Sequence, residues 1–242
     1  MDTMTQPPAA YLNQLIGDLG FVHTIFVAAQ LGIADLLKDG PLSIADLAQA
    51  TGTDSRSLYR IMRALASRGM FSEEADGRFA LTALAEPLRS DAPGSIRARA
   101  LFEGTEAWLR TWANLAYSVR TGQPAFEHLY GKPWFDYLGE QPELAQIFNN
   151  AMAVGSTQDG AAIVDAHDFA GYRKIVDVGG GHGALLALIL DRNAPASGVL
   201  FDSPQVIASV TGVIDGYSAQ GRVEKVAGDF SRRCRRAVMP TY

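Results

Sequence analysis

The sequence predicts an α/β protein in which a helical N-terminal domain precedes a partial domain built on a doubly wound parallel sheet. Two observations carry this prediction. Apolar residues recur at three- and four-residue steps through most of residues 11–156, which is the period of amphipathic helices. After residue 170, short apolar runs instead end in glycine or aspartate, as strands leading into turns do. We therefore expect a helical domain over residues 1–94, a helical connector over 95–170 and a partial sheet domain over 171–242.

The composition is that of an ordinary folded protein, with 48% hydrophobic and 19% charged residues. The single cysteine, Cys234, can form no internal disulfide, which suits a reducing cytoplasm. No run of about 18 apolar residues is present and the first ten residues carry no basic region, so we expect no membrane span or signal peptide. The net charge of -5 argues against general affinity for nucleic acid. These features predict a cytoplasmic protein.

The first helix is expected from Tyr11 onward. Its apolar residues form one stripe, which consists of Leu12, Leu15, Ile16, Leu19, Val22 and Phe26. For this stripe we favour a core-facing helix over a contact between two copies of the chain.

Three short helical segments follow, separated by turn residues. They cover Leu31–Lys38, Ser43–Ala50 and Asp54–Arg68. Ser43 and Asp54 are expected N-caps, and Gly69 is an expected C-cap. Met70–Ser72 and Arg78–Leu81 then flank a polar turn, which predicts a β-hairpin. Three helices followed by a hairpin is the order of a winged helix.

Winged helices often bind DNA, so this alternative has to be weighed. Arg56, Arg60 and Arg63 on the third segment could contact phosphates. The first hundred residues nevertheless hold nine basic and eleven acidic side chains, whereas a DNA-binding surface is normally basic. We expect no nucleic-acid partner, and a winged-helix regulator that senses a small ligand stays open as an alternative.

A second long helix is expected over Ser95–Val119, where apolar residues again form one stripe. The segment Gly131–Ser156 then places aromatic residues before a helix that starts near Pro142. Phe148 and Met152 are four residues apart and so share one face of that helix. From the residues alone, core packing and contact with a bound ring are equally good interpretations of this pair.

The most informative stretch is Lys174–Gly183, which reads KIVDVGGGHG. Its apolar start predicts a buried strand, and four glycines in five positions predict a turn where the backbone approaches another group closely. The spacing is DxGxGxG, formed by Asp177, Gly179, Gly181 and Gly183. It matches neither the GxGxxG of dinucleotide-binding folds nor the Gly-Lys-Ser/Thr end of a phosphate-binding loop.

Two further predicted strands also end in acids. Gly198–Phe201 leads into Asp202, which follows Gly183 by 19 residues, close to the interval at which Rossmann-like folds place an acid. A carboxylate there can accept hydrogen bonds from both hydroxyls of a ribose. The third strand, Arg222–Val226, leads into Gly228, Asp229 and Phe230. One such acid is a weak signal because strand-end aspartates also cap turns, but three in succession are a much stronger one.

With DVGGGHG, LFDSPQV and VAGDF in this order behind a winged helix, the sequence is similar to S-adenosylmethionine (SAM)-dependent O-methyltransferases. This family is typified by plant caffeic acid enzymes and bacterial antibiotic-tailoring enzymes, and the similarity runs from about Tyr11 to Phe230. It implies a homodimer joined through the winged-helix domain and a truncated Rossmann-like methyltransferase domain. It further implies SAM as the cofactor, no metal, and the hydroxyl of a small phenolic molecule as the methyl acceptor.

The resemblance also implies roles for the matched residues around the cofactor. Asp177 would lie beneath the methionine ammonium of SAM, and Asp202 would bind the ribose. Asp229 would accept from the adenine amine, while Phe230 would cover the adenine ring. Close approach of the backbone would be the role of the three glycines, Gly179, Gly181 and Gly183.

The family pattern FNxAMxxxS implies the acceptor site. Phe148 and Met152 would hold the acceptor ring, and Ser156 would approach the methionine end of the cofactor. A phenol with a pKa of about 10 also needs a positioned base, usually histidine. The resemblance places that histidine beyond Tyr242, and none of the four histidines in this chain replaces it convincingly.

The last twelve residues, 231–242, contain four arginines and no acid, unlike the chain before them. Permitted codons for this stretch can be regrouped by one base to encode FEAVPSGGDAY, the kind of sequence that continues the GDF turn in the family. We therefore expect an out-of-frame tail, a poorly stable and catalytically inactive chain, and an open sheet edge at the Lys174 strand. A noncatalytic cofactor-binding remnant is a further alternative.

Overall fold

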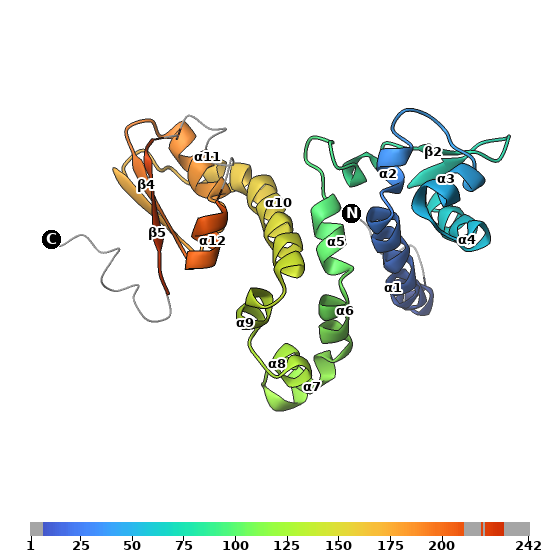
Figure 1. Cartoon of the computed structure of the whole chain (residues 1–242), viewed down its shortest axis with the longest axis horizontal. Coiled ribbons are helices and arrows are strands. Elements are labelled where there is room, and N and C mark those ends of the chain that lie inside the picture. Colours follow the sequence, from blue (N-terminus) through green and yellow to red (C-terminus); the bar gives the residue numbers. More distant parts are fainter. Residues whose placement is uncertain (1–6, 211–218, 220, 230–242) are drawn as a thin grey trace. The chain divides into compact units, whose positions relative to one another are not determined.

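The computed structural model describes residues 7–210, 219 and 221–229, without the side chains of residues 155–158 (Figure 1). The chain separates into two compact units, residues 1–132 and 133–242. The boundaries expected from the sequence, near residues 94 and 170, fall inside these units and stay predictions.

The first unit begins with the predicted winged-helix order (Figure 1). Its elements are α1 (Pro8–Gln30), α2 (Ile33–Leu36), α3 (Ile44–Thr51), α4 (Ser55–Ala66), β1 (Phe71–Glu73), β2 (Phe79–Leu81) and the 3-10 helix η1 (Glu86–Leu88). Strands β1 and β2 pair antiparallel, and Leu42 forms an additional antiparallel bridge with Phe79. The predicted hairpin is therefore confirmed, with Leu42 adding a third short pairing.

Side-chain caps fix the start of α3 and α4, as the sequence predicts. The Ser43 hydroxyl accepts from the backbone N–H of Asp46, and the Asp54 carboxylate accepts from that of Ser57 at 2.8 Å. Gly69 ends the α4 region with φ of 74°, a left-handed conformation that glycine adopts without steric cost. A continuous core fills the space beneath these elements, centred on Ile33, Leu37, Leu47, Met62, Leu65, Phe71 and Phe79.

The prediction of one long helix after residue 95 is wrong. Three short helices occupy this stretch, namely α5 (Arg97–Glu103), α6 (Glu106–Ala113) and α7 (Leu115–Thr121), and α8 (Ala125–Tyr130) follows. The first break occurs at Gly104, where a Cβ atom would lie 2.8 Å from the Cβ of Phe26, and the Thr105 hydroxyl then caps α6. The second break is at Asn114, whose side chain donates to the carbonyl of Arg110 instead of continuing the apolar stripe.

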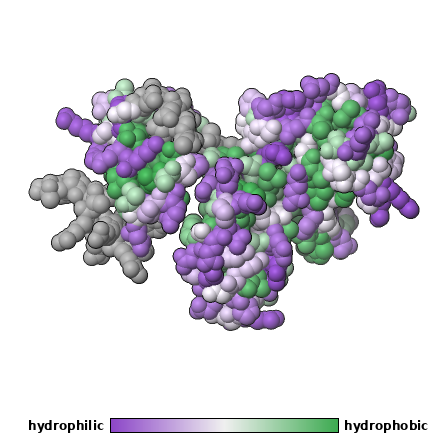
Figure 2. All heavy atoms as spheres, viewed as in Figure 1, coloured by the Kyte–Doolittle hydropathy of each residue, from purple (hydrophilic) through white to green (hydrophobic). Residues whose placement is uncertain are grey.

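The core-facing interpretation of the first helix is wrong for its N-terminal half. Residues 8–17 of α1 are all exposed, whereas Phe26, Ala28 and Ala29 near its other end are buried. Hydrophobic surface is visible where α1 lies in the first unit (Figure 2). By length and composition alone α1 could cross a membrane, although the sequence contains no continuous apolar run of that length, and 11% of its most apolar window is buried.

The second unit contains a three-stranded parallel sheet and its helices (Figure 1). Its elements are α9 (Trp134–Gly139), α10 (Pro142–Ala166), β3 (Lys174–Val178), α11 (Ala184–Arg192), β4 (Ser197–Asp202), α12 (Pro204–Ser209) and β5 (Val223–Ala227). The strand order is β3-β4-β5, so β3 is an edge of the sheet among the described residues, as the sequence predicts. A small core of Leu186, Leu190 and Leu200 joins α11 to β4. The predicted α/β class and the parallel sheet are confirmed.

Candidate functional site

A turn of four glycines connects β3 to α11 at the carboxyl edge of the sheet. Gly179, Gly181 and Gly183 have φ of 72°, 58° and 79°, which side-chain-bearing residues rarely adopt. The N–H of Gly179 donates to the carbonyl of Phe201 at 2.8 Å, which ties the start of the turn to β4. Ligands of open parallel sheets bind at this edge, outside the carboxyl ends of the strands.

Asp202 holds this turn from the end of β4. One of its carboxylate oxygens accepts from the N–H of Gly181 at 2.9 Å, and the other accepts from the N–H of Ser203 at 2.6 Å. The side chain is buried, with 8% of the residue exposed. Each carboxylate oxygen has two lone pairs, so both can still accept from a hydroxyl group of a ligand.

Asp177 lies at the same edge, near the end of β3. Its half-buried carboxylate accepts no hydrogen bond from any described residue. Burial raises the pKa of the Asp177 carboxyl above its ordinary value, and the negative charge of Asp202 raises it further. Asp177 is therefore prepared to accept a cationic hydrogen-bond donor, which would relieve both effects.

Gly180 is a residue that the DxGxGxG spacing passes over. A Cβ atom at this position would lie 2.5 Å from the Asp177 carboxyl carbon and 2.6 Å from Cδ1 of Leu200. The Asp177 carboxylate thus packs directly on the backbone of the turn. The signal for this contact in the sequence is the run of three consecutive glycines, of which only two are needed for φ.

Asp229 brings a third acid to the same edge. The N–H of Gly228 donates to the carbonyl of Asp202 at 2.9 Å, so the exposed Asp229 follows β5 directly beside the end of β4. A Cβ atom at Gly228 would lie 2.7 Å from the ring of Phe201, which sequence reasoning missed. The predicted ring partner Phe230 lies outside the described residues. Among the residues that the structure describes, no group of three His, Cys, Asp or Glu side chains is arranged to hold a metal ion.

The long helix α10 starts at Pro142, as predicted, and runs in the same direction as α11. Asp165 pairs with Arg192 near the C-terminal ends of both helices, and Gly160 packs against Leu188 one to two turns earlier. Ser156, one turn before Gly160, is therefore at the level of the N-terminus of α11, where the glycine turn ends. Its side chain is outside the described part of the chain.

Phe148 and Met152 are closer to the N-terminus of α10 than Ser156, and they therefore lie beyond the level of the glycine turn. The Phe148 ring makes edge-to-face contacts with Trp134 and Phe135 of α9, at centroid distances of 5.6 and 6.2 Å. Met152 is exposed. Trp134 and Phe135 were not singled out in the sequence, although the aromatic run PWFDY contains them.

Of the four histidines, His182 is the one within the glycine turn, where its Nε2 lies 3.4 Å from the Ser209 hydroxyl of α12. A hollow of about 420 Å³ lies at the opposite, amino-terminal edge of the sheet, around Ala196 and Arg222. We assign it no ligand, because both terminal nitrogens of the Arg222 guanidinium already donate to backbone carbonyls, those of Leu190, Asn193, Ala194 and Ala196. Arg222 therefore satisfies backbone carbonyls at the C-terminal end of α11 and in the loop that follows it. The three acids and the glycine turn lie at the opposite, carboxyl edge of the sheet.

The winged-helix unit and the acid-lined edge of the sheet together define the class of two-domain methyltransferases. The chain belongs to the O-methyltransferase family: residues 112–237 match the O-methyltransferase domain, and residues 14–91 match the O-methyltransferase dimerisation domain. The matched region extends past Phe230, where the similarity was expected to end.

The chain is 39% identical over 93% of its length to the phenazine O-methyltransferase PhzM of Lysobacter antibioticus, of which it covers 65%. A solved riboflavin-analogue N,N-dimethyltransferase, RosA of Streptomyces davawensis, has a TM-score of 0.83 at 33% identity, with 98% of this chain and 70% of that chain covered. The O-methyltransferase NcsB1 from neocarzinostatin biosynthesis, solved with SAM and 2-hydroxy-5-methyl naphthoic acid, has a TM-score of 0.72 at 32% identity. In that comparison 86% of this chain and 65% of NcsB1 are covered. The chain spans 55% to 65% of the length of the first curated relatives that it matches.

Proposed function

We propose that this chain is the cofactor-binding part of a cytoplasmic, SAM-dependent methyltransferase that acts on a hydroxyl group of a small aromatic molecule. The observation that carries the proposal is the carboxyl edge of the sheet. Three acids and a glycine turn suit a ligand with an ammonium group and hydroxyls, whereas they would repel the phosphates of a dinucleotide. The carboxylate of Asp177, which accepts no hydrogen bond from the described residues, fits the ammonium of SAM.

In this proposal, each acid holds a different part of the cofactor. Asp177 accepts from the methionine ammonium, Asp202 from the ribose hydroxyls, and Asp229 from the adenine amine. The glycine turn lets the backbone lie close to the cofactor, and Phe230 covers the adenine ring. Ser156 approaches the methionine end.

The acceptor would lie against α10, with Phe148 and Met152 on either side of its ring. Trp134 and Phe135 contact the edges of the Phe148 ring and hold it in place, which supports a rigid aromatic wall. When bound, SAM supplies a methyl group activated by its sulfonium, which an acceptor oxygen can displace. The acceptor proton must pass to a base, and we assign that base to no residue of this chain.

A homodimer is the assembly that we propose. Its support is the match of residues 14–91 to a dimerisation domain and the exposed apolar half of α1 in the same unit. The DNA-binding alternative has less support, since Arg63 is held by Glu73 at 3.3 Å and by the Tyr59 hydroxyl at 3.2 Å.

Calorimetry with S-adenosylhomocysteine (SAH) tests the cofactor site directly. One SAH per folded chain is expected, and a folded chain that binds none would contradict the proposal. A panel of aromatic phenols and aromatic amines with labelled SAM then tests the acceptor class, using the full-length gene product. A gel shift with promoter DNA would instead support the alternative of a winged-helix regulator. The gene sequence around codon 231 decides a separate question, whether residues 231–242 are translated out of frame.

A further inference from the structure

The glycine turn between β3 and α11 has one side chain of its own, that of His182. The other residues of the segment Gly179–Gly183 are glycines. Gly181 and Gly183, on either side of His182, have φ of 58° and 79°, a conformation that residues with side chains rarely adopt. Glycine also loses more conformational freedom on folding than any other residue, so an ordered turn of this kind needs tethers. His182 is the side chain with which the turn itself can supply one.

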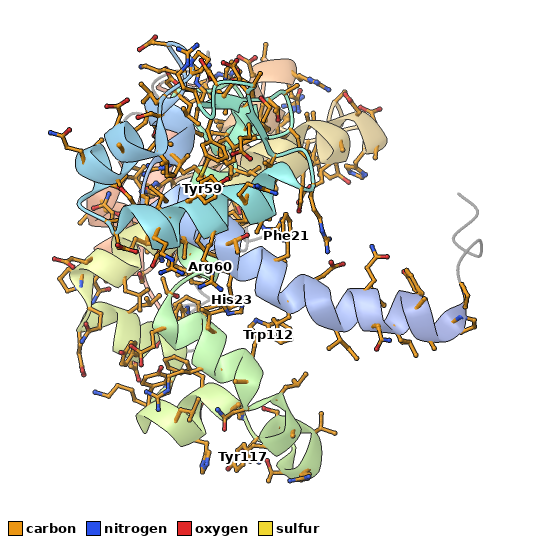
Figure 3. The ribbon with its side chains drawn as sticks, turned by 90° about the vertical axis from the view of Figure 1, so that its right-hand side faces the viewer. Phe21, His23, Tyr59, Arg60, Trp112 and Tyr117 are labelled. Atoms are coloured by element: carbon orange, nitrogen blue, oxygen red, sulfur yellow. The ribbon has the colours of Figure 1, made fainter. Side chains whose placement is uncertain are left out.

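The imidazole of His182 extends from the turn to another element. Its Nε2 atom lies 3.4 Å from the hydroxyl oxygen of Ser209, the last residue of α12. Two other histidines make different contacts: Nδ1 of His23 lies 2.7 Å from a carbonyl of its own helix, and the His128 ring stacks on Tyr117 (Figure 3 labels His23 and Tyr117). Among the described residues, His182 is the histidine whose ring nitrogen lies within hydrogen-bond distance of another side chain.

The hydroxyl of Ser209 determines which of the two atoms donates. A serine hydroxyl has one proton and two lone pairs. Ser209 donates its proton to the carbonyl of Val206 at 2.8 Å, which leaves only its lone pairs for His182. The hydrogen in the contact must therefore belong to the imidazole, so Nε2–H donates to Ser209. In the neutral ring, Nδ1 then carries no hydrogen.

The contact between His182 and Ser209 closes a ring around Asp202. One carboxylate oxygen of Asp202 accepts from the N–H of Gly181, which precedes His182 in the turn. The other accepts from the N–H of Ser203, which caps α12, and α12 then leads to Ser209. The turn, Asp202 and α12 are thus linked at three points. Asp202 is the member of this ring with lone pairs left for a ligand.

The link from His182 to Ser209 is the longest of the three. Its 3.4 Å compares with 2.9 Å and 2.6 Å for the two bonds to Asp202, and N–H···O bonds usually measure about 2.7–3.2 Å. Hydrogen bonds of enzyme sites are often long without ligand and tighten when the ligand binds. The C-terminal end of α12 is also held by Lys225 of β5, which donates to the carbonyl of Val210 at 3.2 Å. His182 is the corresponding link from this end of α12 to the glycine turn.

We propose that His182 is a positioning residue for the ribose of the cofactor. By donating to Ser209 it holds the glycine turn against α12, and this keeps the Asp202 carboxylate in place to accept from the ribose hydroxyls. The contact shortens when the cofactor binds. This inference rests on the proposed function, because it needs a ribose at Asp202. His182 acts through Asp202 and is not the base that the methyl transfer requires.

Calorimetry with SAH and with an SAH analogue that lacks both ribose hydroxyls tests this role. His182→Asn and Ser209→Ala each remove the link, so each should lower the affinity for SAH by about three- to tenfold, the effect of one net hydrogen bond. Neither should change the affinity for the analogue, because that ligand makes no use of the Asp202 carboxylate. Equal losses for both ligands would show a merely structural role and would overturn the proposal.

His182→Gln is the matched variant that should keep the link. The amide nitrogen of glutamine can take the place of Nε2, whereas that of asparagine ends near the position of Nδ1. SAH affinity should therefore stay close to that of the parent chain in His182→Gln. The double variant His182→Asn/Ser209→Ala should bind SAH no more weakly than either single variant, since both remove the same contact. Additive losses would contradict the pairing.

Two further measurements keep the outcomes distinct. A folded parent chain that binds no SAH overturns the proposed function, whereas SAH binding that no substitution at His182 or Ser209 weakens overturns only the positioning role. The chemical shifts of the imidazole nitrogens in the parent chain need no variant at all. They should show hydrogen on Nε2 and none on Nδ1, with a further change at Nε2 when SAH is added, and hydrogen on Nδ1 alone would overturn the proposal.

Discussion

Strands β3 and β4 are hydrogen-bonded neighbours, yet their environments differ sharply. Every residue of β4 except Ser197 is buried, whereas no residue of β3 is fully buried and Val178 is 43% exposed. Strand β4 pairs on both sides, and β3 pairs only with β4 among the described residues. The comparison shows that the strand leading into the glycine turn is not the one that anchors the sheet.

This division separates stability from binding within one small sheet. Strand β4 supplies Leu200 and Phe201 to the interior, and β3 supplies Asp177, whose half-buried charge is a cost to the folded chain. Sites for ligands are commonly drawn from the less stable parts of a protein. Substitutions in the interior of β4 should therefore lower stability, whereas substitution of Asp177 on β3 should weaken cofactor binding.

The largest effect on stability is expected for Leu200→Ala on β4. Leu200 is fully buried, so its truncation should cost about 2–5 kcal/mol and open the sheet of the second unit. Val176→Ala at the middle of β3 is the matched control and should cost about 1 kcal/mol, because Val176 is half-buried. Hydrogen exchange of the sheet amides measures both, and equal losses of protection would contradict the comparison.

The largest effect on binding is expected for Asp177→Asn. Removing one member of a buried, hydrogen-bonded charge pair costs about 2–5 kcal/mol, so SAH affinity should fall by at least about 30-fold. The ligand-free chain should melt at a higher temperature, because the substitution removes a partly buried charge. Asp168→Asn, an exposed aspartate whose bond to the Ala170 N–H asparagine can keep, should change neither quantity.

Gly180→Ala tests the contact between the turn and Asp177. The added Cβ would lie 2.5 Å from the carboxyl carbon of Asp177, and overpacking of this kind costs about 1–3 kcal/mol. We expect SAH affinity to fall by about tenfold. Gly171→Ala is the control in the same unit, since a Cβ there would meet no atom within 4 Å. An unchanged affinity for Gly180→Ala would mean that the Asp177 carboxylate is free to move.

The smallest effect expected is a pH dependence of SAH binding. Because the pKa of Asp177 is raised in the ligand-free chain, binding of the ammonium should strengthen as pH rises through that pKa and then level off. The raised pKa also affects folding: its contribution to stability is fully present below the ordinary aspartate pKa, and it is lost as the pH rises through the raised pKa of Asp177. The slope for binding should stay below tenfold per pH unit, and Asp177→Asn should abolish it.

Much of this arrangement could be predicted from the sequence, since local signals are strong where glycine and caps decide the backbone. The winged-helix order, the caps at Ser43 and Asp54, and the glycine-to-helix turn follow from residue types alone. The breaks at Gly104 and Asn114 could not be predicted, because the first depends on the contact of Gly104 with Phe26, far away in the chain. The exposure of the N-terminal half of α1 could not be predicted, because the sequence of an apolar stripe is the same whether the stripe is buried by its own chain or by another molecule.

At the candidate site the sequence predicted which acids would meet but not what holds them. Parallel strands bring their carboxyl ends to one edge, so Asp177, Asp202 and Asp229 could be placed together in advance. The hydrogen bonds from Gly181 and Ser203 to Asp202 depend on the conformation of the turn, which spacing alone does not specify. The roles of these residues toward a cofactor stay predictions.

The contact between Gly160 and Leu188 is a place where α10 packs closely on α11, and Phe148 lies far from it on the same helix. A Cβ atom at position 160 would lie 2.7 Å from Cδ1 of Leu188, so any other residue here would have to displace that methyl group from between α10 and α11. Phe148 lies twelve residues away on the same rigid rod, a distance of about 18 Å. If α10 tilted about this contact, Phe148 would move several times further than the residues next to Gly160. The space beside Phe148 for an acceptor ring would therefore depend on Gly160, which does not line that space.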